Sequence, residues 1–191
     1  MSDTIAAGLL TAIVGLIAAI IAATITVLFA FRHERLRRAT RTHDEYLSWL
    51  RGLIPECKYI TSTIDEVAPL YRAMLNGAGP QCPTKHLNAD FPGAARFGVM
   101  KHPRGMMLFK PLTSAYRDVV HTNEMMTRFE DDFRRVANAG MMNWQIHLGG
   151  ILRSTDACMP AARASVQKLL DAASDQERVE AKHSPTFRDI D

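Results

Sequence analysis

The chain has 191 residues, 47% of them hydrophobic, and a formal net charge of +3. The basic excess lies in residues 32–41, which hold five arginines and one glutamate, whereas the charges of residues 42–191 cancel. Because residues 42–191 have no basic patch, the composition excludes a nucleic-acid-binding domain there. The three cysteines form no C-x-x-C pair, which excludes a disulfide framework and agrees with a reducing compartment.

Residues 5–31 form the most distinctive segment of the chain. They carry no ionisable side chain, and Thr11, Thr24 and Thr26 are their only polar side chains. A helix of that length covers roughly 40 Å, against about 30 Å for the hydrocarbon core of a bilayer. The slightly acidic leader and the length of the apolar run argue against a cleaved signal peptide, which begins with positive charge and has a shorter core. We therefore predict a short outer N-terminus and a transmembrane helix within residues 1–31.

The arginines behind this segment predict its orientation. Positively charged residues accumulate on the cytoplasmic side of a span, and each arginine near anionic headgroups contributes on the order of 1 kcal/mol. We expect a single-pass protein of the cell (inner) membrane, with the N-terminus outside and residues 32–191 in the cytoplasm. The interfacial residues, which we call the arginine collar, are Arg32, Arg35, Arg37, Arg38 and Arg41.

Small residues recur along one side of the predicted span at alternating steps of four and three. Such a stripe lets a second helix approach closely, which favours a homo-oligomer. An alanine-rich span also produces stripes of this kind by chance, so both interpretations stand. The stripe consists of Gly8, Ala12, Gly15, Ala19 and Ala22, and Thr26 continues it.

Residues 32–76 show helical periodicity in three neighbouring lines of seven-residue spacing, which suits a helix packed in a bundle. Pro55 and Pro69 predict kinks or breaks, and the glycine- and proline-containing run 76–80 ends the helix. The lines are Leu36, Leu50, Cys57, Ile64 and Tyr71; Leu47, Ile54, Ala68 and Leu75; and Leu53, Ile60, Val67 and Met74.

The rest of the chain predicts a long insertion loop, two helices and a tail. Residues 77–110 are rich in glycine and proline and are long for a connection inside a compact domain. Pro111 suits the first turn of a helix over 111–138, and the turn after it folds the next helix, 141–173, back antiparallel. Pro160 predicts a split in that helix. Residues 174–191 are polar and predict a disordered tail.

The predicted fold class is therefore all-α. It comprises a single N-terminal transmembrane helix (domain 1–31) and a cytoplasmic antiparallel helical bundle of three or four helices (domain 32–173, with the insertion near 77–110). The tail 174–191 completes the chain.

Candidate chemistry is sparse. There is no nucleophile elbow, no phosphate-binding glycine motif and only one E-x-x-H, at residues 180–183, so we predict no catalytic residue, no metal site and no cofactor. His86 and His102 fall in the insertion. Asn123 interrupts an apolar line of the second predicted helix; a buried amide there needs either a partner on a neighbouring helix or a ligand.

These patterns favour a non-enzymatic, self-associating scaffold or adaptor. Its expected partners are the lipid bilayer, a second copy of the chain and a cytoplasmic protein. The alternative is a cytoplasmic-side ligand or metal sensor, or a weak enzyme, with its site around residues 77–110 and possible ligand contacts at His86, His102 and Asn123.

Overall fold

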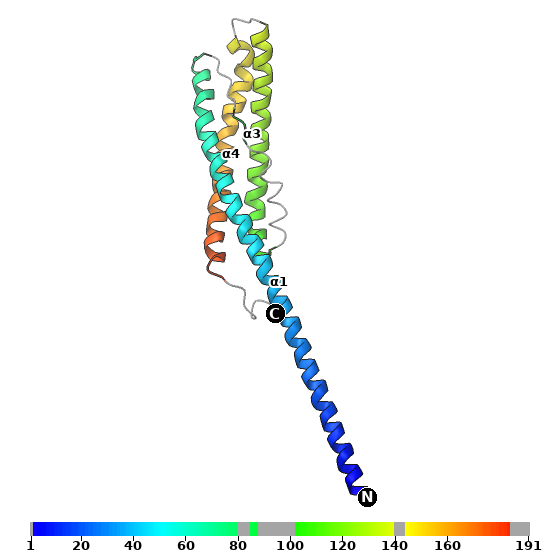
Figure 1. Cartoon of the computed structure of the whole chain (residues 1–191). Helices are drawn as coiled ribbons and strands as arrows, with labels where there is room; N and C mark the ends of the chain where they lie inside the picture. The colour runs from blue at the N-terminus through cyan, green and yellow to red at the C-terminus, as the bar shows by residue number, and fades with distance from the viewer. Residues whose placement is uncertain (1, 80–84, 88–101, 140–143, 184–191) are drawn as a thin grey trace. The chain divides into compact units, whose positions relative to one another are not determined.

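A computed structural model describes residues 2–79, 85–87, 102–139 and 144–183; side chains are described from Gly15 onward, except Ala18 and Pro103 (Figure 1). Its elements are α1 (Ser2–Leu75), the 3₁₀ turn η1 (Pro103–Gly105), α3 (Met106–Asn138) and α4 (Trp144–Glu180). The described residues contain no strand, so the all-α prediction is confirmed for this part of the chain.

The chain divides into two units, one formed by Met1–His43 with Ser184–Asp191 and the other by Asp44–His183. The division falls inside α1, between His43 and Asp44, where the helix is uninterrupted. His43 and Asp44 are therefore consecutive residues of one helix. The two units are described separately below.

The first unit contains the part of α1 before Asp44. Its large apolar side chains from Leu16 to Phe31 are 49–72% exposed, and in the described chain only this helix is long and apolar enough to cross a bilayer, judged by length and composition. The hydroxyls of Thr24 and Thr26 donate to the carbonyl oxygens of Ile20 and Ala22, both at 2.8 Å. Both hydroxyls are thus satisfied within their own helix.

The second unit has one hydrophobic core, to which α1, α3 and α4 each contribute a face. On α1 the buried residues follow two of the expected seven-residue lines, the one through Leu50 and the one through Leu53. The line through Leu47 is mostly half-buried. The largest fully buried side chains come from all three helices: Tyr46, Leu50, Ile60, Tyr71, Met74, Leu108, Leu112, Met126, Phe129, Leu148, Leu152 and Met159.

Ion pairs give the register of α1 against α4. Arg51 pairs with Glu177 at 3.2 Å, Asp65 with Arg163 at 2.6 Å and Arg72 with Asp156 at 3.2 Å. Residue numbers rise on α1 as they fall on α4, so these two helices run in opposite directions.

Two further contacts give the direction of α3. Thr155 of α4 donates a hydrogen bond to the carbonyl of Met125 in α3, and Arg104, just before α3, pairs with Glu180 at the end of α4. The higher residue number on α3 thus meets the lower one on α4, so these two helices are antiparallel. The ring of Phe129 contacts Tyr71, and the ring of His102 contacts Tyr46, so α1 and α3 run in the same direction. Figure 1 shows the three helices of this unit side by side.

The predicted breaks at proline are wrong. α1 continues through Pro55 and Pro69, and α4 continues through Pro160. All three rings lie on exposed positions, so water can reach the carbonyl groups that proline leaves without an amide partner. The apolar face of each helix, on the opposite side, packs without interruption.

Three expected boundaries also move. α3 begins at Met106, so Pro111 lies inside this helix rather than in its first turn, and the described part of the insertion ends at η1. α4 continues to Glu180, which is only 1% exposed, instead of giving way to a tail at residue 174. Residues 184–191, the remainder of the expected tail, and residues 80–84 and 88–101 of the insertion lie outside the described residues.

Candidate functional site

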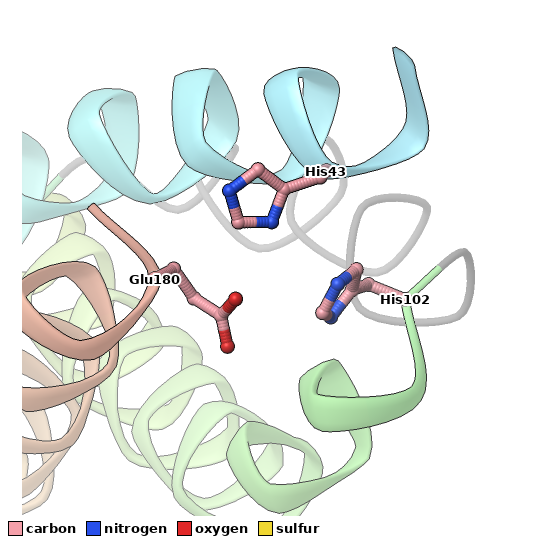
Figure 2. A group of neighbouring side chains, drawn as sticks. All are labelled: His43, His102 and Glu180. Atoms are coloured by element: carbon pink, nitrogen blue, oxygen red, sulfur yellow. The ribbon is translucent and has the colours of Figure 1, made fainter. Parts of the chain in front are cut away.

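Three potential metal ligands from three separate elements lie together: His43 on α1, His102 at the start of η1 and Glu180 at the end of α4. One ligand atom from each residue lies within 4.8 Å of the other two. Figure 2 shows the two imidazole rings and the carboxylate turned toward a common space. His43 is 5% exposed and Glu180 is 1% exposed, while His102 is half-buried. We refer to these three residues as the His–Glu cluster.

Local interactions orient the imidazole of His102. Its Nδ1 caps η1 by accepting a hydrogen bond from the backbone N–H of Arg104 at 3.3 Å. The phenol ring of Tyr46 stacks on the imidazole, with centroids 4.4 Å apart and planes 4° from parallel. The ring of His102 is therefore held by its own turn on one side and by α1 on the other.

The carboxylate of Glu180 is nearly inaccessible to water and is balanced by a nearby guanidinium. Nη1 of Arg104 donates to Oε1 of Glu180 at 2.8 Å. The side chain of Arg104 is 43% exposed, so its charged end reaches the surface. Burial of an uncompensated carboxylate is costly, and this cation offsets much of that cost.

Gln176 connects the surrounding elements. Its side-chain oxygen accepts from the hydroxyl of Tyr46, and its Nε2 donates to the backbone carbonyl of Arg104 at 3.1 Å. Burial raises the pKa of the Tyr46 phenol well above its usual value, and the negative charge of Glu180 raises it further against the opposing effect of Arg104. Tyr46 therefore remains a neutral hydrogen-bond donor at physiological pH.

The chemistry of the His–Glu cluster is that of a metal-ligand set. Two imidazoles and one carboxylate match the donor set that holds zinc in several metalloenzymes and iron in facial-triad proteins. In both cases the protein leaves further coordination positions for water or another ligand. Among the described residues, this is the group in which three such donors lie together.

Asn123, expected to contact a neighbouring helix or a ligand, binds a piece of the insertion instead. Its Oδ1 accepts from the backbone N–H of Leu87 at 2.9 Å, and its Nδ2 donates to the carbonyl of Leu87 at 2.7 Å. Leu87 is itself only 3% exposed. The side-chain amide of Asn123 thus pairs with both backbone polar groups of the buried residue Leu87, as a neighbouring β-strand would, and binds this residue to α3.

The residues before Leu87 are fastened in the same way. Lys85 pairs with Glu66 of α1, and Nε2 of His86 lies 3.0 Å from Oε1 of Glu130 on α3. We call residues 85–87 the docked tripeptide. Each of its residues contacts a different helix side chain, so the tripeptide is attached to both α1 and α3.

The structure does not bring the three expected ligand contacts together. His86 and Asn123 lie near each other through the docked tripeptide, but His102 belongs to the His–Glu cluster. Asn123 comes 17 residues after Met106, or roughly 25 Å along α3, whereas His102 lies just before this helix begins.

The membrane-related residues lie on the first unit. Gly15, Ala19 and Ala22 are exposed, and a Cβ atom added at Gly15 meets nothing within 4 Å. The exposure of Gly8 and Ala12 is not described. The arginine collar is exposed throughout, and Arg38 donates to Glu34 at 3.0 Å.

The described cysteines are poorly suited to nucleophilic chemistry. Cys57 is buried, and burial with the nearby Glu56 raises its pKa to about 12. Burial and the charge of Asp118 also raise the pKa of Cys158. Since the thiolate is the nucleophilic form, both thiols remain in the unreactive state near neutral pH.

Sequence reasoning missed His43, although a signal was present. His43 occupies the vacant position of the seven-residue line between Leu36 and Leu50, where an apolar residue is expected. Its partners, His102 and Glu180, are far away in the chain, so no local sequence motif indicates the cluster. The buried position of Glu180 was hidden by the polar composition of the last turn of α4.

Comparison of the chain with models of known protein families, with characterised proteins and with solved structures finds no match.

Proposed function

We propose that the chain is a single-pass membrane protein whose helical unit, residues 44–183, lies in the cytoplasm as a bundle of three helices. The observation that carries this proposal is the apolar surface of residues 15–31, which the described part of the first unit leaves exposed. An apolar surface of this extent in water favours association with lipid or another apolar partner. The whole apolar segment, residues 5–31, covers roughly 40 Å as a helix and is long enough to span the hydrocarbon core of a bilayer.

The arginine collar supports the proposed orientation. It lies directly after the apolar segment, where cytoplasmic positive charge is expected. A reporter fused to the C-terminus should be active only on the cytoplasmic side, and the chain should resist extraction from membranes at alkaline pH. Recovery in the soluble fraction without detergent, or an external C-terminus, would contradict the proposal.

Within this arrangement the span serves self-association. Support comes from the small-residue stripe, of which Gly15, Ala19 and Ala22 are exposed. Because a Cβ atom at Gly15 has open space around it in the single chain, Gly15→Leu should leave the monomer intact and weaken only helix–helix contact. Crosslinking in membranes should show fewer dimers for Gly15→Leu and unchanged dimers for the lipid-facing control Ile17→Leu. Equal crosslinking of all three proteins would reject this part of the proposal.

The cytoplasmic unit then acts as a scaffold or adaptor without catalysis. The protonated state of Cys57 and Cys158 supports this choice, since neither thiol is activated. Crosslinking in membranes, followed by identification of neighbouring chains, tests it. A single recurrent cytoplasmic protein supports an adaptor, and recovery of this chain alone supports a self-assembling scaffold. Turnover of a bound small molecule by the purified chain would contradict both.

The alternative function, a cytoplasmic-side ligand or metal sensor, is favoured by one specific observation. The His–Glu cluster supplies a metal-ligand set, of which only His102 belongs to the insertion 77–110 where sequence placed the site. Sensing requires that the cluster bind an ion.

A further inference from the structure

We propose that the His–Glu cluster binds one divalent transition-metal ion of the zinc class. This inference goes beyond membrane anchoring and does not depend on it. His102 and Glu180 belong to the second unit, and His43 is the residue of α1 directly before Asp44, where that unit begins.

The donor types select the class of ion. Imidazole nitrogen suits zinc and other first-row transition metals, whereas calcium and magnesium prefer oxygen ligands alone. Two histidines with one carboxylate recur in zinc sites that keep a fourth position for water. The cluster offers this set from three elements, and Figure 2 shows the donors turned toward one another.

The spacing of the donors is close to that of a bound site. Tetrahedral ligands of zinc lie about 3.4 Å apart when the metal–ligand bonds are about 2.1 Å. The ligand atoms of the cluster lie within 4.8 Å, so an ion requires the widest pair to close by roughly 1.5 Å. Small rotations of two imidazole rings and of a glutamate side chain supply such a movement without a change of the backbone.

Burial makes a cation favourable at this place. Glu180 is 1% exposed, and the guanidinium of Arg104 pairs with its carboxylate at 2.8 Å. A divalent ion would share this carboxylate with Arg104 or displace it. Displacement is possible because the side chain of Arg104 is 43% exposed and can turn its guanidinium into water. Metal and Arg104 therefore compete for Glu180.

Metal binding also acts on η1. A neutral imidazole accepts through one nitrogen and carries a proton on the other. An ion bound through Nδ1 of His102 takes the lone pair that now accepts from Arg104; an ion bound through Nε2 moves the proton to Nδ1, which then cannot accept. In both cases the 3.3 Å hydrogen bond that caps η1 is lost. Metal binding therefore weakens two interactions of Arg104, the one made by its backbone N–H with His102 and the one made by its guanidinium with Glu180.

The test uses the full chain in detergent, freed of metal and dialysed against Zn²⁺, Co²⁺ or Ca²⁺. We expect one Zn²⁺ per chain, a visible absorption spectrum typical of four-coordinate Co²⁺, a rise in Tm with Zn²⁺ and no binding of Ca²⁺. Absence of stoichiometric Zn²⁺ and Co²⁺ binding by a chain that retains its helical circular dichroism overturns the proposal.

Variants locate the site. His43→Gln and His102→Ala should each weaken Zn²⁺ binding at least about tenfold, while His121→Gln, an exposed histidine of α3, should bind like the original chain. Equal binding by all three variants would place the ion elsewhere and overturn the proposal.

Arg104→Met gives the sharper result, because it removes the competitor and keeps every ligand. We expect it to bind Zn²⁺ several-fold more tightly, and weaker or unchanged binding contradicts the competition. Because Glu180→Gln alone leaves Arg104 without its carboxylate, the double variant Arg104→Met/Glu180→Gln tests the ligand instead. It should fold and lose the ion; retention of tight binding would overturn the role of Glu180. None of these outcomes changes the result of membrane fractionation. A failure of the metal-binding proposal therefore leaves the proposed membrane anchoring unaffected.

Discussion

Residues 15–31 and residues 46–74 lie on the same uninterrupted helix, yet their side chains meet different surroundings. In the first region the large apolar residues are 49–72% exposed and occupy every side of the helix. In the second the buried apolar residues are 0–7% exposed and occupy one face, with charged residues on the other. The backbone stays α-helical through both regions. What differs is the distribution of apolar side chains. An apolar surface on every side is typical of a helix in lipid, the environment proposed for the first region, and a single apolar face is typical of a helix that packs on a protein core, as the second does.

Aspartate substitutions should break the comparison most strongly. Ile60 is fully buried, so Ile60→Asp places an unpaired carboxylate in the core at a cost of several kcal/mol, comparable to the whole stability of a domain. We expect loss of the cooperative thermal transition while the chain stays in membranes. The double variant Ile17→Asp/Ile21→Asp should do the reverse, since each aspartate costs about 3 kcal/mol in a bilayer. Matching phenotypes for the two variants would mean that the two regions share one environment.

Truncation of an aromatic core residue should have the next largest effect. Phe129 is fully buried and contacts Tyr71 edge-on, with ring centroids 5.2 Å apart. Phe129→Ala should lower the free energy of unfolding by about 3–5 kcal/mol, measured by urea titration of the detergent-solubilised chain. Met107→Ala, at a residue 73% exposed on the same helix, is the control and should change it by less than about 0.5 kcal/mol. A small loss for Phe129→Ala would mean that α1 and α3 do not share a packed core.

Loss of the docked tripeptide should cost less. Asn123→Leu removes both partners of the backbone of Leu87, which is buried, and should lower stability by about 1–3 kcal/mol. Hydrogen exchange at the amide of Leu87 should accelerate in this variant, whereas exchange at core amides of α4 should follow only the global change. Asn123→Asp, which keeps the acceptor for the N–H group, should lie between the two. An Asn123→Leu variant at least as stable as the original chain would indicate that the amide serves a ligand rather than the fold.

The pH dependence should be the smallest effect. Arg163 donates to both carboxylate oxygens of Asp65, at 2.6 and 3.1 Å, and holds the pKa of that carboxyl below its usual value. A carboxyl with a lowered pKa in the folded state adds stability above its unfolded pKa, about 3.9, and loses it as the pH falls through the folded value. We expect Asp65→Asn to lower Tm slightly at pH 7 and to match the original chain in strong acid.

The effect is small because both side chains are about half exposed, so water screens the pair. Glu34→Gln, which breaks the pair with Arg38 in the first unit, is the matched control and should leave the Tm of the second unit unchanged. A Tm difference for Asp65→Asn that persists undiminished below pH 3 would contradict the ionic origin.

The sequence predicted the helical character of both regions well, because each carries its periodicity in many residues. Leu53, Ile60 and Val67 repeat every seven positions, and all three are buried in the structure. One misplaced residue cannot disturb such a pattern. Helix ends and interruptions depend on single residues instead, and there the predictions at Pro55 and Pro160 failed. The exposed side of a helix tolerates proline because water solvates the unpaired carbonyl, and spacing alone does not reveal this tolerance.

The candidate site was beyond the reach of sequence reasoning for a different reason. His43, His102 and Glu180 come from three elements, and they meet only because α1 and α3 run in the same direction while α4 returns. That topology depends on contacts between helices far apart in the chain, which local patterns do not specify. Asn123 was singled out correctly as a polar residue on an apolar line, but its partner, the backbone of Leu87, carries no sequence signature.

The hydroxyls of Thr24 and Thr26 have a consequence for how two copies could recognise each other. Each hydroxyl already donates its proton to a carbonyl of the preceding turn, so neither has a free donor to offer across an interface. Pairing through Gly15, Ala19 and Ala22 would then depend mainly on shape. Such recognition should respond to the addition of a single methyl group and be insensitive to salt and acidity, unlike any contact made by the arginines that follow.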